Sequence, residues 1–126
     1  MTSLIAWVGI DSRGQSSAYL ASDSRLTWGN SASWDTGGKL FASSRFPEIF
    51  GYCGDVTFPS QILPHTIELI DCNLLVKKED TIDRKITKIF RNIQNDFQNY
   101  PEMFNKGFEI LYFSTLLSGY AKINIA

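Results

Sequence analysis

The sequence predicts an α+β domain, because strand patterns fill its first half, two helical patterns follow, and a further buried strand comes after them. The chain has 126 residues, of which 44% are hydrophobic and 20% charged. This length and composition suit one globular domain with its own core. We therefore treat residues 1–126 as a single domain with the element order ββββααβ.

Two β-hairpins are predicted in the first half of the chain. Apolar segments with strand patterns alternate there with turn residues. The expected turns are Asp11–Gly14 within the first hairpin and Arg45–Pro47 within the second, and the polar segments 28–31 and 35–38 are expected to be turns between them. The expected strands are Ser3–Ile10, Ser17–Ser22, Lys39–Ser43 and Glu48–Cys53.

Two helices are predicted from apolar residues at helical spacing. The first runs from Pro59, which suits a first helical turn, to about Cys72, and Pro64 is expected to kink it or to delay its start. The second is expected to have Asp80 as its N-cap and to end at Tyr100-Pro101. Its apolar stripe consists of Ile82, Ile86, Ile89, Phe90, Ile93 and Phe97.

A buried strand is predicted at Phe108–Leu117, because this run is almost continuously apolar and lies between Gly107 and Gly119. The tail Tyr120–Ala126 has the composition of one short additional strand. These segments complete the predicted fold.

Charge and composition exclude several classes of function. The net charge is −1, and the arginines are scattered along the chain, which disfavours nucleic-acid binding. The apolar run Leu4–Ile10 is too short for a signal peptide or a membrane span, so we expect a cytoplasmic protein without a membrane partner. Two cysteines and one histidine give no pattern for a disulfide framework or a zinc site, and no metal or cofactor is expected.

Thr2 is the first candidate functional residue. Its small side chain permits removal of Met1, which would leave a threonine with a free α-amine. A threonine hydroxyl needs an adjacent base to act as a nucleophile, and an N-terminal threonine carries an amine of its own. Thr2 is therefore a candidate nucleophile.

Four sequence features occur in order along the first half of the chain: Thr2, the run Ser22-Asp23-Ser24-Arg25-Leu26-Thr27-Trp28-Gly29-Asn30, Lys39 and Gly51-Tyr52-Cys53-Gly54. Together they resemble the proteasome β-subunit and HslV-type threonine peptidases. These enzymes are N-terminal nucleophile (Ntn) hydrolases. The resemblance implies an αββα sandwich of antiparallel sheets between helix layers. It also implies that the C-terminal part of that fold, the last strands and a helix, is missing from this chain.

The resemblance implies a catalytic set of Thr2, Asp23, Lys39 and Gly54. In this scheme Thr2 is the nucleophile and its α-amine, with an ordinary pKa of about 7.7–8.0, is the base. Lys39, held by Asp23, would favour the alkoxide, and the Gly54 N–H would bind the oxyanion. Asp23 and Lys39 are 16 residues apart, as in the family.

The resemblance also implies how substrate binds. The backbone of Thr27 would pair with an extended peptide, as in strand addition. An apolar specificity pocket is expected beside it. The residues that would line this pocket are Leu26, Gly37, Phe41, Tyr52 and Val56.

Three functions remain open from the sequence. The first is a threonine-type endopeptidase that acts on polypeptides, forms a homo-oligomeric ring and works with an ATP-dependent unfoldase, as the family implies. The second is an inactive or truncated β-like subunit that acts only in assembly. The third is an Ntn amidase that acts on a small amide.

Overall fold

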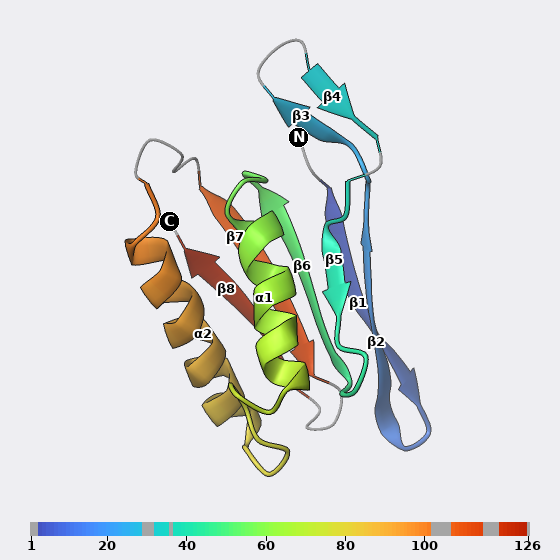
Figure 1. Cartoon of the computed structure of the whole chain (residues 1–126). Coiled ribbons are helices and arrows are strands. Elements are labelled where there is room, and N and C mark those ends of the chain that lie inside the picture. The colour runs from blue at the N-terminus through green and yellow to red at the C-terminus, as the bar shows by residue number, and fades with distance from the viewer. Residues whose placement is uncertain (1–2, 29–31, 36, 102–106, 115–118, 126) are drawn as a thin grey trace.

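The computed structural model describes residues 3–28, 32–35, 37–101, 107–114 and 119–125, and the fold is α+β (Figure 1). Its two helices are α1 (Pro59–Asp71) and α2 (Ile82–Gln98). The strands before the helices are β1 (Leu4–Asp11), β2 (Gly14–Ser22), β3 (Leu26–Trp28), β4 (Ala32–Trp34), β5 (Leu40–Ala42) and β6 (Glu48–Gly54). The strands after them are β7 (Phe108–Ser114) and β8 (Gly119–Ile125).

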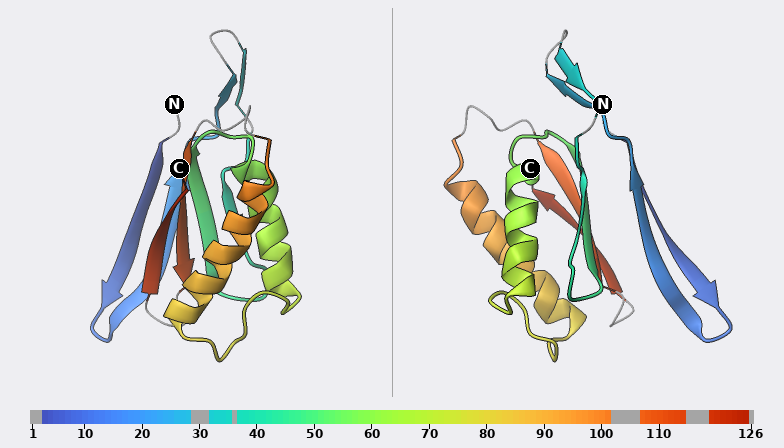
Figure 2. Two further views of the ribbon diagram at one scale, coloured as in Figure 1. Left: turned by 90° about the vertical axis from the view of Figure 1, so that its left-hand side faces the viewer. Right: turned by 45° about the vertical axis from the view of Figure 1, so that its right-hand side comes forward.

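An antiparallel sheet with the strand order β5-β6-β7-β8 forms the centre of the molecule. Both helices cover one of its faces, and the β1–β2 hairpin lies on the other (Figure 2). The short β3–β4 hairpin extends beyond one end of this arrangement. Neither described helix has the length and apolar character needed to cross a lipid bilayer.

The core lies between the sheet and the helices. Alternate side chains of β6 and β7 point to this side, so Phe50, Tyr52, Ile110 and Tyr112 are completely buried. Fully burying a large apolar side chain stabilises a fold by about 1.5–3 kcal/mol. The residues of α1 and α2 that pack against these strands include Ile62, Leu63, Ile70, Ile89 and Ile93.

Gly51 allows the β1–β2 hairpin to approach the opposite face of β6. A Cβ atom at this position would lie 3.0 Å from Leu4 Cδ1, 3.0 Å from Leu40 Cδ2 and 3.3 Å from Leu20 Cδ1. Only a residue without a side chain therefore fits between these three leucines without displacing them. The contact holds the hairpin against the sheet at the end where β1 begins.

Most predicted elements are confirmed, with small changes at their ends. The strand predicted at Phe108–Leu117 is observed as far as Ser114, and residues 115–117 lie outside the described residues. The first hairpin pairs Leu4 with Ser22, and β2 already begins at Gly14. Helix α1 begins at Pro59 and continues through Pro64, so its start is not delayed. The C-terminal tail forms β8, which pairs along the whole of β7.

Between the two predicted hairpins the structure has a pair of short strands. The sequence had predicted turns there, at segments 28–31 and 35–38. Leu26–Trp28 pairs with Ala32–Trp34, so the observed order is ββββββααββ. Each strand has three residues, and β4 is exposed along its length. Such short strands carry too few residues for an alternating pattern to be recognised.

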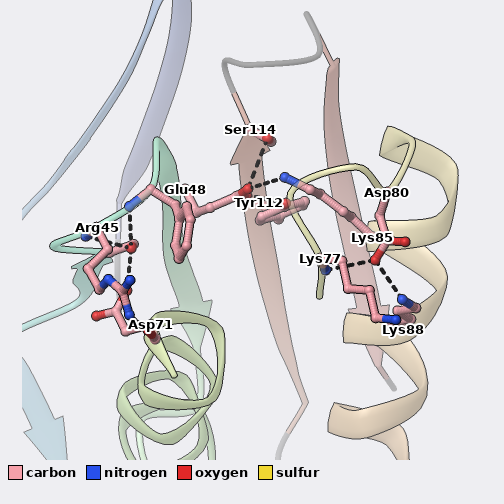
Figure 3. A network of polar contacts seen from close by, with 11 residues as sticks. Arg45, Glu48, Asp71, Lys77, Asp80, Lys85, Lys88, Tyr112 and Ser114 are labelled. Atoms are coloured by element: carbon pink, nitrogen blue, oxygen red, sulfur yellow. Dashed lines mark hydrogen bonds and ion pairs between the residues drawn. The ribbon is translucent and has the colours of Figure 1, made fainter. Parts of the chain in front are cut away.

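The predicted cap of the second helix was wrong by one residue. Thr81 is the N-cap of α2, and its side chain accepts a hydrogen bond from the Arg84 N–H at 3.3 Å. Asp80 instead accepts the Lys77 N–H at 2.8 Å and pairs with the Lys88 ammonium at 2.5 Å (Figure 3). The Asp80 carboxylate is thus bound to Lys77 and Lys88, and Thr81 caps the helix.

Candidate active site

Asp23 and Lys39 form an ion pair at the end of the molecule where β1 begins. The distance from Lys39 Nζ to Asp23 Oδ1 is 2.8 Å. The lysine side chain is 0% exposed, whereas the aspartate side chain is 41% exposed. A buried ammonium is thus held by a carboxylate that solvent can reach. The Lys39 hydrogen bond is the main reason that the pKa of Asp23 lies below its usual range.

The ends of three strands position this pair. Asp23 directly follows β2, and its N–H donates to the Ser3 carbonyl at 3.4 Å. The Ser22 hydroxyl also donates to the Ser3 carbonyl, at 3.0 Å. Lys39 directly precedes β5, and its carbonyl accepts the Tyr52 N–H at 3.3 Å. The beginning of β1 is therefore fixed beside Asp23.

Arg25 contributes to the site through its main chain, which the sequence did not indicate. Its carbonyl accepts a hydrogen bond from Lys39 Nζ at 2.6 Å. Its side chain points to Asp35 instead, and the Arg25 Nε to Asp35 Oδ1 distance is 2.6 Å. This pairing lowers the pKa of Asp35 and raises the pKa of Arg25. The position of Arg25 within the Asp-Ser-Arg run was the available signal.

Gly54 ends β6, two residues after the Tyr52 whose N–H donates to the Lys39 carbonyl. Its φ of 94° lies in the left-handed region that favours glycine. A Cβ atom at this position would lie 2.8 Å from the Gly107 carbonyl oxygen and 2.9 Å from Phe108 Cα. The backbone at this strand end therefore requires glycine for its conformation and for its packing.

Thr2 lies outside the described residues. Its neighbour Ser3 is described, and the Ser3 carbonyl is held by Asp23 and Ser22 as given above. Ser3, the first described residue, is thus hydrogen-bonded to Asp23, whose carboxylate is paired with Lys39.

The five residues predicted to line a specificity pocket are mostly packed against one another. The buried Leu26 side chain fills the space over Gly37, where a Cβ atom would lie 2.3 Å from Leu26 Cγ. Phe41 stacks on Tyr52 with ring centroids 6.4 Å apart, and burial raises the pKa of Tyr52. Val56 packs against the main core. Thr27 lies in β3, where it is opposite Ser33.

An apolar cavity of about 190 Å³ lies between β2 and the strands β5 and β6. Phe41 is the one predicted pocket residue that lines it. The other lining residues are Leu20, Leu40, Ala42, Ile49 and Phe50. One of these lining residues, Leu40, directly follows Lys39 in the chain.

A buried polar cluster at the opposite end of β6 was also missed from the sequence (Figure 3). The Glu48 carboxylate accepts hydrogen bonds from Lys85 Nζ at 2.6 Å, from Ser114 Oγ at 3.2 Å and from the Tyr112 hydroxyl. Burial and the carboxylate raise the pKa of Tyr112. The available signal was Lys85, which lies at helical spacing with the buried Ile89 and Ile93.

The donor set of the described residues does not form a metal centre. No three His, Cys, Asp or Glu side chains gather within the part of the chain that the structure describes. Cys53 and Cys72 form no disulfide within the described residues, and the Cys53 thiol donates to Glu109 Oε2 at 3.8 Å. Where β2 ends and β5 begins, the described groups available for chemistry are thus a charged lysine, a carboxylate and main-chain groups.

The chain matches no protein-family model, and no curated protein and no solved structure shows significant similarity to it. The geometry of the site and the sequence motifs are therefore the basis for assigning a function.

Proposed function

We propose that this protein is a threonine-type peptidase of the N-terminal nucleophile kind, with Thr2 as its nucleophile after removal of Met1. The observation that carries the proposal is the Lys39–Asp23 pair, which lies beside the beginning of β1. The family resemblance implied this pair, and its two charged atoms are 2.8 Å apart. The helices on one face of the sheet and the hairpin on the other support an Ntn-type sandwich.

In the proposed mechanism the Thr2 α-amine accepts the proton of the Thr2 hydroxyl, and the alkoxide attacks a peptide carbonyl. The buried Lys39 ammonium stabilises negative charge on the Thr2 oxygen because little solvent screens it. The Gly54 N–H donates to the oxyanion of the tetrahedral intermediate. The α-amine then returns the proton to the leaving amine, and water hydrolyses the acyl-enzyme.

The substrate in this proposal is an extended polypeptide that pairs with β3 at Thr27. Within the described residues β3 pairs with β4 alone, so its second edge is open to strand addition. Assembly into a ring, and feeding by an ATP-dependent unfoldase, belong to the same proposal. Sedimentation of the purified protein measures the assembly, because a ring sediments much faster than a 14.2 kDa chain.

The test compares the hydrolysis of unfolded casein by the wild type, Thr2→Ala and Ser3→Ala. Ser3→Ala is the matched control, since it removes a neighbouring hydroxyl while the Ser3 carbonyl keeps its contacts. We expect Thr2→Ala to abolish hydrolysis and Ser3→Ala to retain it. Intact mass reports whether Met1 has been removed. Unchanged casein hydrolysis by Thr2→Ala would rule the proposal out.

A parallel assay with a small amide identifies the substrate class. Turnover of the small amide with no cleavage of casein, and its loss in Thr2→Ala, would replace the peptidase with an amidase that uses the same nucleophile. Absence of turnover for both substrates, with Met1 removed, would favour a subunit that acts only in assembly.

A further inference from the structure

Helix α2 carries a row of cations on its outer side that no part of the proposed peptidase uses. Arg84, Lys88 and Arg91 are spaced at i, i+4 and i+7, so they lie on one face of the helix. We call these three residues the α2 basic face. Together with Asp83 and Thr87 they line a shallow depression of about 360 Å³. Among the described side chains, those that line the depression all belong to α2.

Two of these cations are not fixed by a side-chain hydrogen bond or ion pair among the described residues, although, after the hydrogen bond from Lys88, the charge of Arg84 helps to lower the pKa of Asp80. The side chains of Arg84 and Arg91 are exposed and form no hydrogen bond or ion pair within the described part of the chain. Lys88 is held by Asp80, with Nζ and Oδ2 2.5 Å apart. One ordered ammonium thus lies between two guanidinium groups that can bind carboxylates in a bidentate manner.

The position of Arg84 is unfavourable for the helix itself. Thr81 is the N-cap, so Arg84 occupies the third helical position, where a glutamate would complete a capping box. A cation there also opposes the helix dipole, and cations at i, i+4 repel one another. Arg84 therefore does not arise from the requirements of helix stability.

The charge of this segment differs from that of the rest of the protein. Residues 77–91 contain six Lys or Arg and three Asp or Glu, whereas the remaining sequence contains six and ten. A long polyanion such as a nucleic acid would extend beyond the α2 basic face and meet this acidic remainder. A short acidic segment would not.

We propose that the α2 basic face is a docking site for an acidic segment of a partner protein. Arg84 to Arg91 covers about 10 Å along the helix axis, since each residue rises 1.5 Å. An extended peptide places every second side chain on the same side at intervals of about 6.6–7 Å. Two carboxylates of such a peptide reach Arg84 and Arg91, while Lys88 lies between them. This proposal is independent of the proposed peptidase activity.

The test measures binding of a fluorescein-labelled peptide of eight glutamates by fluorescence anisotropy. We expect the wild type to bind it, and a peptide of eight glutamines to bind much more weakly. In the double variant Arg84→Glu/Arg91→Glu the affinity should fall by about tenfold or more. Arg13→Glu is the matched control, because Arg13 is a highly exposed arginine in the β1–β2 turn, and its affinity should match that of the wild type.

Two further readouts separate docking from a structural effect. The single variant Arg84→Glu should raise the melting temperature, because it completes the capping box, while it weakens peptide binding. Addition of the glutamate peptide to the wild type should shift the amide signals of Arg84, Thr87 and Arg91 in a protein NMR spectrum. Wild-type affinity in the double variant, equal binding of the glutamine peptide, or tighter binding of an eight-nucleotide single-stranded DNA would overturn the proposal.

Discussion

The Lys85 ammonium lies 2.6 Å from the Glu48 carboxylate, and both side chains are buried between α2 and β6. Tyr112 and Ser114 donate to the same carboxylate from β7. Each oxygen of the buried carboxylate thus has a donor, and the cluster joins the sheet to the helix layer. Removal of one member of such a pair leaves the other as an uncompensated charge.

We predict that Lys85→Met destabilises the protein by about 3–5 kcal/mol, the usual cost of breaking a buried ion pair. Urea unfolding monitored by circular dichroism measures the change. The double variant Glu48→Gln/Lys85→Met is the control. It removes both charges and keeps an oxygen that can accept from Tyr112 and Ser114, so it should lose less stability than Lys85→Met. Equal losses in the two variants would contradict this account.

Replacement of Gly54 should reduce both stability and activity. Gly54→Ala places a side chain on a backbone with φ of 94° and brings its Cβ within 2.8 Å of the Gly107 carbonyl oxygen. Backbone strain of this kind alone costs about 1–3 kcal/mol. The strand end must also shift, which displaces the N–H assigned to the oxyanion.

Gly14→Ala provides the comparison for Gly54→Ala. Gly14 has φ of 111°, but a Cβ atom at this position would have no described atom within 4 Å of it. It therefore reports the cost of the backbone conformation without the clash. Thermal melting should give a clearly larger loss for Gly54→Ala, and peptide hydrolysis should fall in Gly54→Ala alone. Similar melting temperatures for the two variants would show that the clash is relieved at no cost.

Lys39→Met tests the proposed role of the buried ammonium. Methionine keeps much of the apolar stem, and Asp23 remains partly exposed to solvent, so the protein should still fold. Loss of a preorganised charge beside the reacting oxygen should lower the hydrolysis rate by about 10²–10³-fold. Rates measured with saturating casein, alongside circular dichroism, separate the two effects. A rate close to that of the wild type would show that Lys39 has only a structural role.

The depressed pKa of Asp23 predicts a pH dependence of stability. An unfolded aspartate titrates near pH 3.9, and Lys39 holds the folded-state pKa of Asp23 below its usual range. Charged Asp23 therefore stabilises the fold above about pH 4, and this contribution is lost as the pH falls through the folded-state pKa.

Asp23→Asn isolates this contribution, because it cannot ionise. The difference in melting temperature between the wild type and Asp23→Asn should be constant between about pH 5 and 7 and should shrink below about pH 4. Other carboxyls with lowered pKa values, such as Asp80 and Asp35, titrate in both proteins and cancel. A difference that does not vary down to pH 2 would argue against the ion pair.

The sequence predicted those parts of the fold that depend on local patterns. The apolar stripe from Ile82 to Phe97 corresponds to α2, and the predicted turn residues connect the strands of the hairpins β1–β2 and β5–β6. The pairing of Asp23 with Lys39 was expected from the family resemblance. The number of residues between them does not by itself say that their side chains meet. Local periodicity and a recognised motif were therefore both needed.

Features that depend on long-range contacts were not predictable. Glu48 and Lys85 are 37 residues apart, and each alone has the character of a solvated charge. The sequence pattern favours Asp80 as a helix cap. This prediction was wrong because Asp80 pairs with Lys88, and that contact exists only once α2 has formed. The hydrogen bond from Lys39 to Arg25 is accepted by a main-chain carbonyl, so the side chain of Arg25 did not itself indicate it.

The Glu48 cluster also has a consequence for how the sheet assembles. In the native alignment Glu48 is opposite Ser114, and Phe50 is opposite Tyr112. If β6 slipped by one residue, every side chain would change face, and Ile49 would replace the carboxylate beside Lys85. The ammonium would then be buried without a counter-charge among apolar residues. The single acidic residue at the start of β6 thus penalises misaligned sheets during folding.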